Sequence, residues 1–154
     1  AKDGDYQNIK TINSVGTSSW TDGSVKTGKT YYYKIKTVVK TQNGEQTSGF
    51  SNVKSAKAVP AKTTLKAKAS DAKNVKLTWS KVKGASGYEI YRSNSKDGKC
   101  SKVKTISKGS TTSYKNGKLK KSTTYYYIRA YRKVNGKKVY GSYSSVVSVK
   151  TKAK

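Results

Sequence analysis

The sequence contains no histidine and no methionine, one cysteine, one proline and only 7 acidic residues among 154. Without histidine, the commonest general base of enzymes is absent. A lone cysteine excludes a disulfide within the chain, and Cys100 stands among lysines, where we expect a surface thiol that pairs chains in an oxidising medium. No apolar run reaches membrane-spanning length, and no signal-peptide pattern occurs. Because position 1 is not methionine, we expect a processed product or a fragment.

The few carboxylates form no pattern that is typical of a catalytic or metal site. All except Glu89 stand beside glycine or in polar stretches, where turn capping is their usual role. Asp3-Gly4-Asp5 resembles the start of a calcium loop, but the later glutamate and the ligand spacing are missing. Gly84 and Gly87 precede a strand pattern and not a helix, so they form no phosphate loop. We expect no catalytic residue, no metal and no cofactor, and therefore not an enzyme.

Positive charge is what the sequence has in excess. Its net charge is +27, of which +5 falls in residues 1–57 and +22 in residues 58–154. Such a surface attracts polyanions, and the spread of the lysines favours a diffuse attraction to an anionic cell-wall polymer or glycan. The same lysines are also consistent with a solvated surface whose sheet edges resist pairing. With only three arginines, base-specific reading is not expected, whereas nonspecific nucleic-acid binding is expected at low salt.

The aromatic and β-branched residues indicate strands and not disorder. Apolar residues make up only 32% of the chain, and weak hydrophobicity with high charge is typical of disordered segments. However, 13 tyrosines and 2 tryptophans are present, and Val75, Leu77 and Trp79 alternate with polar residues as in a half-buried strand. No segment has a helical period. Asn135-Gly136 and Gln42-Asn43-Gly44 each stand between β-rich runs and predict hairpins.

An internal repeat divides the chain. Residues 3–23 align without a gap to residues 97–117, with eight identical positions among 21, and each copy continues into a run of three tyrosines. The stretch from about Leu65 to Ser95 has no counterpart in the first copy. Pro60, the only proline, stands between the copies. We predict an incomplete module over 1–57, a linker over 58–64 and a complete module over 65–154.

The second copy resembles a fibronectin type III module of secreted and wall-attached proteins of Gram-positive bacteria. Four segments carry the resemblance: Val75–Trp79 as strand B, Gly87–Arg92 as strand C, Leu119 with Tyr125 as the tyrosine corner before strand F, and Gly141–Ser144 as the start of strand G. The resemblance implies an all-β fold of tandem fibronectin type III-like (immunoglobulin-like) β-sandwiches. The first sandwich is incomplete, because it lacks strands A to C.

The resemblance and the alternation together predict the core. The expected core residues are Trp79, Tyr88, Ile90, Leu119, Ile128 and Ala130 in the second module, and Tyr31, Tyr33 and Ile35 in the first. In the second strand F, counting from Tyr125 turns Arg129 inward, whereas counting from Ala130 turns Ile128 inward. We predict the second register, with Arg129 outside and a bulge near Tyr125 that absorbs the difference.

Outward tyrosines are the candidate ligand contacts. Alternation places Tyr32, Tyr91 and Tyr140 on outer sheet faces, where they could stack on sugars or bases. Their simpler role is cross-strand pairing, at about 0.2–1 kcal/mol for each pair.

The missing strands of the first module have two explanations, a trimmed fragment or a strand-donating partner chain.

The expected function is a noncatalytic spacer or adhesion module of an extracellular protein, either secreted or associated with the cell wall. Electrostatic affinity for anionic wall polymers or glycans would hold it in place. The alternatives are a specific carbohydrate-binding or adhesin domain, and an accessory domain of a larger secreted hydrolase. A nucleic-acid binder is a weaker alternative.

Overall fold

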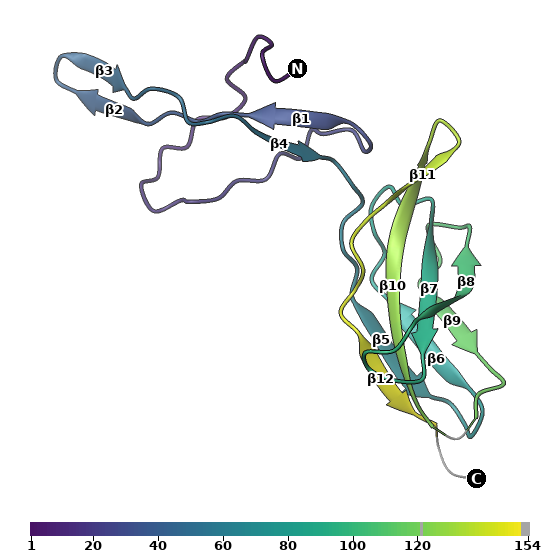
Figure 1. The fold of residues 1–154 in the computed structure, drawn as a ribbon. Helices are drawn as coiled ribbons and strands as arrows, with labels where there is room; N and C mark the ends of the chain where they lie inside the picture. The colour runs from purple at the N-terminus through teal and green to yellow at the C-terminus, as the bar shows by residue number, and fades with distance from the viewer. Residues whose placement is uncertain (121, 152–154) are drawn as a thin grey trace. The chain divides into compact units, whose positions relative to one another are not determined.

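The computed structural model in Figure 1 describes residues 1–120 and 122–151. The chain divides into two compact units, Ala1–Ala58 and a second that begins at Val59. Every regular element of the described residues is a strand. No helix of these residues is long and apolar enough to cross a membrane. The strands are β1 (Thr30–Tyr33), β2 (Val38–Thr41), β3 (Gly44–Thr47), β4 (Lys54–Lys57), β5 (Leu65–Ala69), β6 (Val75–Trp79), β7 (Gly87–Ser93), β8 (Ser101–Ile106), β9 (Ser113–Asn116), β10 (Thr123–Val134), β11 (Lys137–Tyr140) and β12 (Val147–Lys150).

The second unit is a sandwich of two antiparallel sheets. One sheet has the order β5-β6-β9, and the larger has the order β11-β10-β7-β8, with β12 also paired to β10. In Figure 1 the two sheets lie face to face, and the long strand β10 runs along one of them. Strands β6 and β10 alternate buried and partly exposed residues, as expected for strands with one face on a core.

The core lies between these two sheets. It contains Leu65, Val75, Leu77, Trp79, Val82, Tyr88, Ile90, Leu119, Tyr126, Ile128 and Ala130, all at most 8% exposed. The Trp79 and Tyr88 rings pack with centroids 5.4 Å apart. The Tyr88 hydroxyl accepts a hydrogen bond from the Val82 backbone and donates one to the Gly109 carbonyl. A buried tyrosine is tolerated here because its one polar atom is satisfied.

Strand β10 turns Ile128 and Ala130 inward and Arg129 outward. The predicted bulge near Tyr125 is wrong, because β10 pairs without interruption with β12, β7 and β11. The register shift lies instead in the β7–β8 pair, between Ile90 and Tyr91.

The tyrosine corner also differs from its prediction by one residue. Tyr126, and not Tyr125, is buried, and its hydroxyl donates to the Asn116 side chain at 2.8 Å. Burial raises the pKa of Tyr126 to about 12, so the hydroxyl stays protonated. Lys118, which lies between β9 and β10, has a positive φ of 58°.

The first unit contains two separate two-stranded ladders, β1-β4 and β2-β3. No residue from 1 to 58 is buried. Tyr31 and Tyr33 are half-buried, whereas Ile35, predicted to be a core residue, is 75% exposed. That prediction is wrong because residues 1–58 form no second sheet to cover the inner face of β1.

The first unit nevertheless repeats the backbone pattern of the second. Ile35 and Ser51 make the same two bonds as Ile128 and Ser144: the isoleucine N–H donates to the serine hydroxyl at 3.1 Å, and the serine N–H donates to the isoleucine carbonyl at 2.8 Å. Likewise, Ser48 N–H donates to the Thr37 carbonyl as Gly141 N–H does to that of Ala130. Ile35 is therefore the counterpart of Ile128.

The two hairpins differ in their turns. Asn135 and Gly136 both have positive φ, 48° and 75°, which suits a two-residue turn between twisted strands. In the first unit the turn residues are Gln42 and Asn43, and only the following Gly44 has a positive φ, of 109°. The Asn-Gly pair therefore has a different position in each hairpin. It supplies both turn residues in the second unit, whereas in the first unit Asn43 is the second turn residue and Gly44 already pairs with Thr41.

Part of the stretch 58–64 packs on the second unit. Pro60 and Thr63 are buried, and the Thr63 hydroxyl donates to the Ser80 carbonyl at 2.5 Å. A side chain at Gly141 would collide with the Pro60 carbonyl, so the glycine permits this close approach.

Candidate functional site

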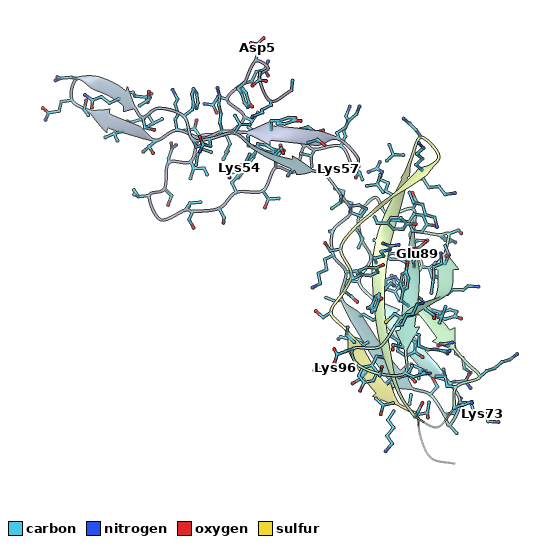
Figure 2. The ribbon with its side chains drawn as sticks, in the orientation of Figure 1. Asp5, Lys54, Lys57, Lys73, Glu89 and Lys96 are labelled. Carbon is cyan, nitrogen blue, oxygen red and sulfur yellow. The ribbon has the colours of Figure 1, made fainter. Side chains whose placement is uncertain are left out.

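The outer face of the larger sheet gathers most of the tyrosines singled out from the sequence. We call it the tyrosine face, defined by Glu89, Tyr91, Tyr127, Arg129, Tyr140 and Tyr143. Strand alternation places all of these side chains except Tyr143, since the residues that precede and follow Arg129 point into the core. Tyr143 lies between β11 and β12 and packs on Tyr127. Figure 2 labels Glu89 on this sheet.

Glu89 is the centre of the face and is only 1% exposed. One carboxylate oxygen accepts hydrogen bonds from Arg129 at 2.9 Å and Tyr91 at 2.8 Å. The other accepts from Lys138 at 3.0 Å and Tyr140 at 3.2 Å. The Lys102 ammonium lies 3.5 Å away. Arg129 is directly opposite Glu89 across the β7–β10 pair, so the register itself creates the central ion pair.

This environment fixes the charges of the cluster. Burial alone would raise the pKa of Glu89, but the hydrogen bonds from Arg129, Lys138 and Tyr91 outweigh it and lower that pKa from 4.5 to about 2. The bond with Glu89 in turn raises the pKa of Lys138. Burial raises the pKa of Tyr91, and its bond to the carboxylate raises it further. Glu89 is therefore a permanent anion among protonated partners, and it is unsuited to transfer protons near neutral pH.

The aromatic rings pack on one another and on the guanidinium. Tyr91 and Tyr127 are stacked with centroids 5.3 Å apart, and Tyr143 meets Tyr127 edge-on at 4.7 Å. Arg129 lies over the Tyr140 ring at 3.6 Å and near that of Tyr143 at 4.8 Å. Such contacts contribute about 0.5–2 kcal/mol each. The ring faces are thus largely occupied by neighbours, and the Tyr91 and Tyr140 hydroxyls are bonded to Glu89.

The three predicted ligand contacts have different surroundings. Tyr91 and Tyr140 come together around Glu89 and are half-buried. Tyr32 belongs to the first unit, where it is half-buried and pairs with Ser55 of β4. Tyr143 is the most open ring of the tyrosine face, at 40% exposed, and sequence reasoning did not single it out as a contact.

Sequence reasoning also missed Glu89 and Arg129. A signal was present, because Glu89 is the one acidic residue that stands neither beside glycine nor in a polar stretch, and it lies on the outward side of its strand. Among the residues that the structure describes, no three histidine, cysteine or acidic side chains gather in a way that could hold a metal.

Cys100 is half-buried directly before β8 and forms no disulfide. Its thiol donates to the Gly98 carbonyl at 3.6 Å. A hydrogen bond with this sulfur, together with burial, raises the pKa of Tyr127 to about 12. The thiol therefore lies at the border of the tyrosine face.

No family model matches the chain, and no curated protein matches it. Solved structures do. The FN1–FN3 domains of chicken CNTN1 match with a TM-score of 0.53 and 20% identity over 87% of this chain and 46% of that one. A β-1,2-glucanase from Parabacteroides distasonis matches with a TM-score of 0.51 and 20% identity over 74% of this chain and 17% of that one. An Fn3-like protein from Clostridium thermocellum is 26% identical over 63% of this chain and 95% of that one, with a TM-score of 0.48.

These matches bear on the fold. The structural neighbours are fibronectin type III domains, and the described residues form an all-β chain of strands in antiparallel sheets. The chain spans less than half of the CNTN1 structure and a smaller part of the glucanase. The fold alone assigns no activity, because such sandwiches host many roles.

Proposed function

From an all-β chain with the fibronectin type III fold, we propose a noncatalytic spacer or adhesion module of a secreted cell-surface protein. Diffuse positive charge holds this module against anionic wall polymers or glycans. The observation that carries the proposal is a net charge of +27 with few local counter-charges. In the described part of the chain, the salt bridges involve only four cations, Lys40, Lys102, Arg129 and Lys138.

The distribution of the lysines supports a diffuse attraction. Figure 2 shows Lys54 and Lys57 projecting from the first unit, and Lys73 and Lys96 from the second. All four are exposed. At physiological ionic strength, charges act over about 8 Å, so scattered lysines each attract a nearby stretch of polymer but build no single site. A flexible polyanion suits such a surface better than a compact anionic ligand.

The tyrosine face supports the spacer role over a specific sugar site. The Tyr91 and Tyr140 hydroxyls donate to Glu89, and the Tyr91 ring stacks on Tyr127, which leaves few free polar groups at the centre of the face for a sugar. Two surface hollows of about 250 and 350 Å³ lie elsewhere, one beside Tyr114 and one beside Leu65. Tyr143 remains the ring best exposed for stacking.

Co-sedimentation with purified Gram-positive cell walls tests this proposal. We expect binding at about 20 mM salt that falls about tenfold or more by about 150 mM, because the attraction is screened. Walls stripped of their anionic polymers should bind little. Duplex DNA should compete at low salt, since its phosphates attract the same lysines.

Two matched double variants separate a diffuse charge from a site. Lys54→Gln with Lys57→Gln should weaken binding about as much as Lys73→Gln with Lys96→Gln. Loss with one pair alone would contradict a diffuse attraction. Binding that survives high salt and disappears in Tyr143→Ala would favour a carbohydrate-binding module, and absence of binding at low salt would refute the proposal.

A further inference from the structure

The outer faces of the two sheets of the second unit carry different charges. On the larger sheet, Arg129, Lys138 and Lys102 surround the carboxylate of Glu89, so that face contains its own anion. On the smaller sheet, β5-β6-β9, the outward side chains are lysines and hydroxyl-bearing residues, and no carboxylate stands among them. We call this surface the lysine face, and its residues are Lys66, Lys68, Ser70, Lys76, Thr78, Ser113 and Lys115.

Alternation and register bring three of these lysines into one row. Val75 and Leu77 are fully buried, so Lys76 between them points to solvent. Lys76 is directly opposite Lys68 of β5 on one side and Lys115 of β9 on the other. All three lysines are exposed. Because the Cβ atoms of opposite residues are about 4.5–5.5 Å apart, the row spans about 10 Å across the sheet.

The row has no counter-charge of its own. In the part of the chain that the structure describes, no ion pair includes any of the three lysines. Asp71 lies in the turn between β5 and β6, where its carboxylate accepts the Lys73 N–H at 2.9 Å and the Asn74 amide at 2.8 Å. These hydrogen bonds lower the pKa of Asp71 more than the charge of Lys115 does. Like charges directly opposite each other destabilise a sheet, so a bound anion relieves a repulsion that the fold contains.

One of the two surface hollows lies on this row. Its volume is about 250 Å³, and it is lined by Ser70, Lys76, Ser113, Tyr114 and Lys115. Two lysines that are neighbours in the row therefore border the same space as two serines. The hollow offers an anionic group both positive charge and hydroxyl donors.

These donors suit phosphate better than a carboxylate. A lysine ammonium binds phosphate as a point charge, and a hydroxyl donates a further hydrogen bond to another oxygen. A planar carboxylate is matched best by the fork of arginine, and the lysine face contains no arginine. Lysines about 5 Å apart in a row suit a flexible chain that carries one phosphate in each short repeat.

We propose that the lysine face is an ordered binding site for a phosphodiester polymer of the cell wall. Successive phosphates lie against Lys68, Lys76 and Lys115, and one of them occupies the hollow. This inference rests on the proposed function, since the polymer that the diffuse charge attracts is the one that the row orients. The scattered lysines collect the polymer from any side, whereas the row sets its direction across the strands.

Binding of poly(glycerol phosphate) to the full chain at about 150 mM salt tests the site, because weak long-range attraction is screened there. Lys68→Gln with Lys115→Gln should weaken binding about tenfold or more, since two phosphate contacts are lost. Lys104→Gln with Lys133→Gln is the matched control, because it removes the same charge from exposed positions outside the lysine face. The control should weaken binding less than about threefold. Lys68→Arg with Lys115→Arg should keep most of the affinity.

Two further measurements separate an ordered site from a loss of charge or of folding. The slope of log K against log salt concentration should fall by about 1.4 in Lys68→Gln with Lys115→Gln, because each phosphate contact to a single strand contributes about 0.7. The unfolding midpoint of this variant at low salt should not fall, since the substitution removes a repulsion. On titration of the wild type with poly(glycerol phosphate), the amide signals of Lys76 and Ser113 should shift most.

The outcomes distinguish this site from the diffuse attraction. Equal weakening by the two glutamine pairs, in a wild type that still binds walls at low salt, refutes the lysine row and leaves the proposed function standing. A chain that binds neither walls nor poly(glycerol phosphate) refutes both. Tighter binding of polygalacturonate or of duplex DNA that depends on Lys68 and Lys115 overturns the assignment to a phosphodiester wall polymer.

Discussion

Replacing Glu89 by glutamine tests the ion cluster on the tyrosine face. The carboxylate is 1% exposed, and its pKa is lowered from 4.5 to about 2. A lowered pKa in the folded state stabilises the fold above the unfolded-state value and loses this contribution as the pH falls toward the folded-state value. The shift corresponds to about 3 kcal/mol of unfolding free energy, and we expect about 2–3 because Arg129 and Lys138 are partly exposed.

Urea unfolding followed by Trp79 fluorescence measures this contribution, since Trp79 lies in the core of the same unit. Glu89→Gln should lower the unfolding free energy by about 2–3 kcal/mol at pH 7. The difference between wild type and variant should shrink as the pH falls from about 4.5 to about 2. General charge repulsion also grows at low pH, but it affects both proteins and cancels in their difference.

Asp97→Asn is the control for the loss of one negative charge, because Asp97 is exposed in the same unit. It should change the unfolding free energy by less than about 0.5 kcal/mol. The reasoning fails if Glu89→Gln is as stable as wild type at pH 7. It also fails if the two proteins lose stability in parallel between pH 4.5 and 2.

Five further substitutions test the packing and the turns by urea unfolding. Ile128→Ala should cost about 2–4 kcal/mol, whereas the matched Ile35→Ala should cost less than about 0.5, since only the first is buried; equal costs would contradict the incomplete core. Tyr126→Phe should cost about 1–2 kcal/mol, because it leaves the Asn116 oxygen with one fewer donor, and an unchanged midpoint would argue against this bond. Gly136→Ala should cost about 1 kcal/mol, because φ is +75° there; Gly136→Asn should cost less, and the reverse order would contradict a left-handed turn.

Alternation in the sequence, with a choice between two registers of β10, oriented the strands of the second unit. A period of two decides which residues share a face, so Ile128 and Ala130 could be placed inside without knowing their partners. It does not encode the length of the preceding loop. The corner was therefore placed at Tyr125 and not at Tyr126, and a bulge was predicted where β10 pairs with β7 without interruption.

Burial in the first unit could not be predicted from its local pattern. Ile35 stands in the same strand pattern and makes the same backbone bonds as Ile128. Whether such a residue is buried depends on the opposing sheet, which is a property of other segments. The exposure of Ile35 is thus a tertiary effect that no local reading of its strand contains.

The candidate site was predictable in part. Outward positions for Tyr91 and Tyr140 follow from alternation. The carboxylate between them does not, because it requires the register that sets Arg129 opposite Glu89 and the pairing that brings Lys138 from a third strand. Cross-strand registers depend on turn lengths and pairing order, neither of which a single strand reveals.

In each unit a serine hydroxyl accepts a hydrogen bond from an isoleucine N–H. The position of this serine has a consequence for resistance to aggregation. Residues 141–146, which include Ser144, separate β11 from β12, so this edge of the larger sheet is divided into two runs of four residues. Runs this short are poor templates for growth of a fibril, which needs about six or seven residues in register. Neighbouring modules with similar sequences are prone to stick to one another while they fold. The serine hydroxyl that interrupts the edge strand thus helps to prevent one module from adding its strands to the sheet edge of the next.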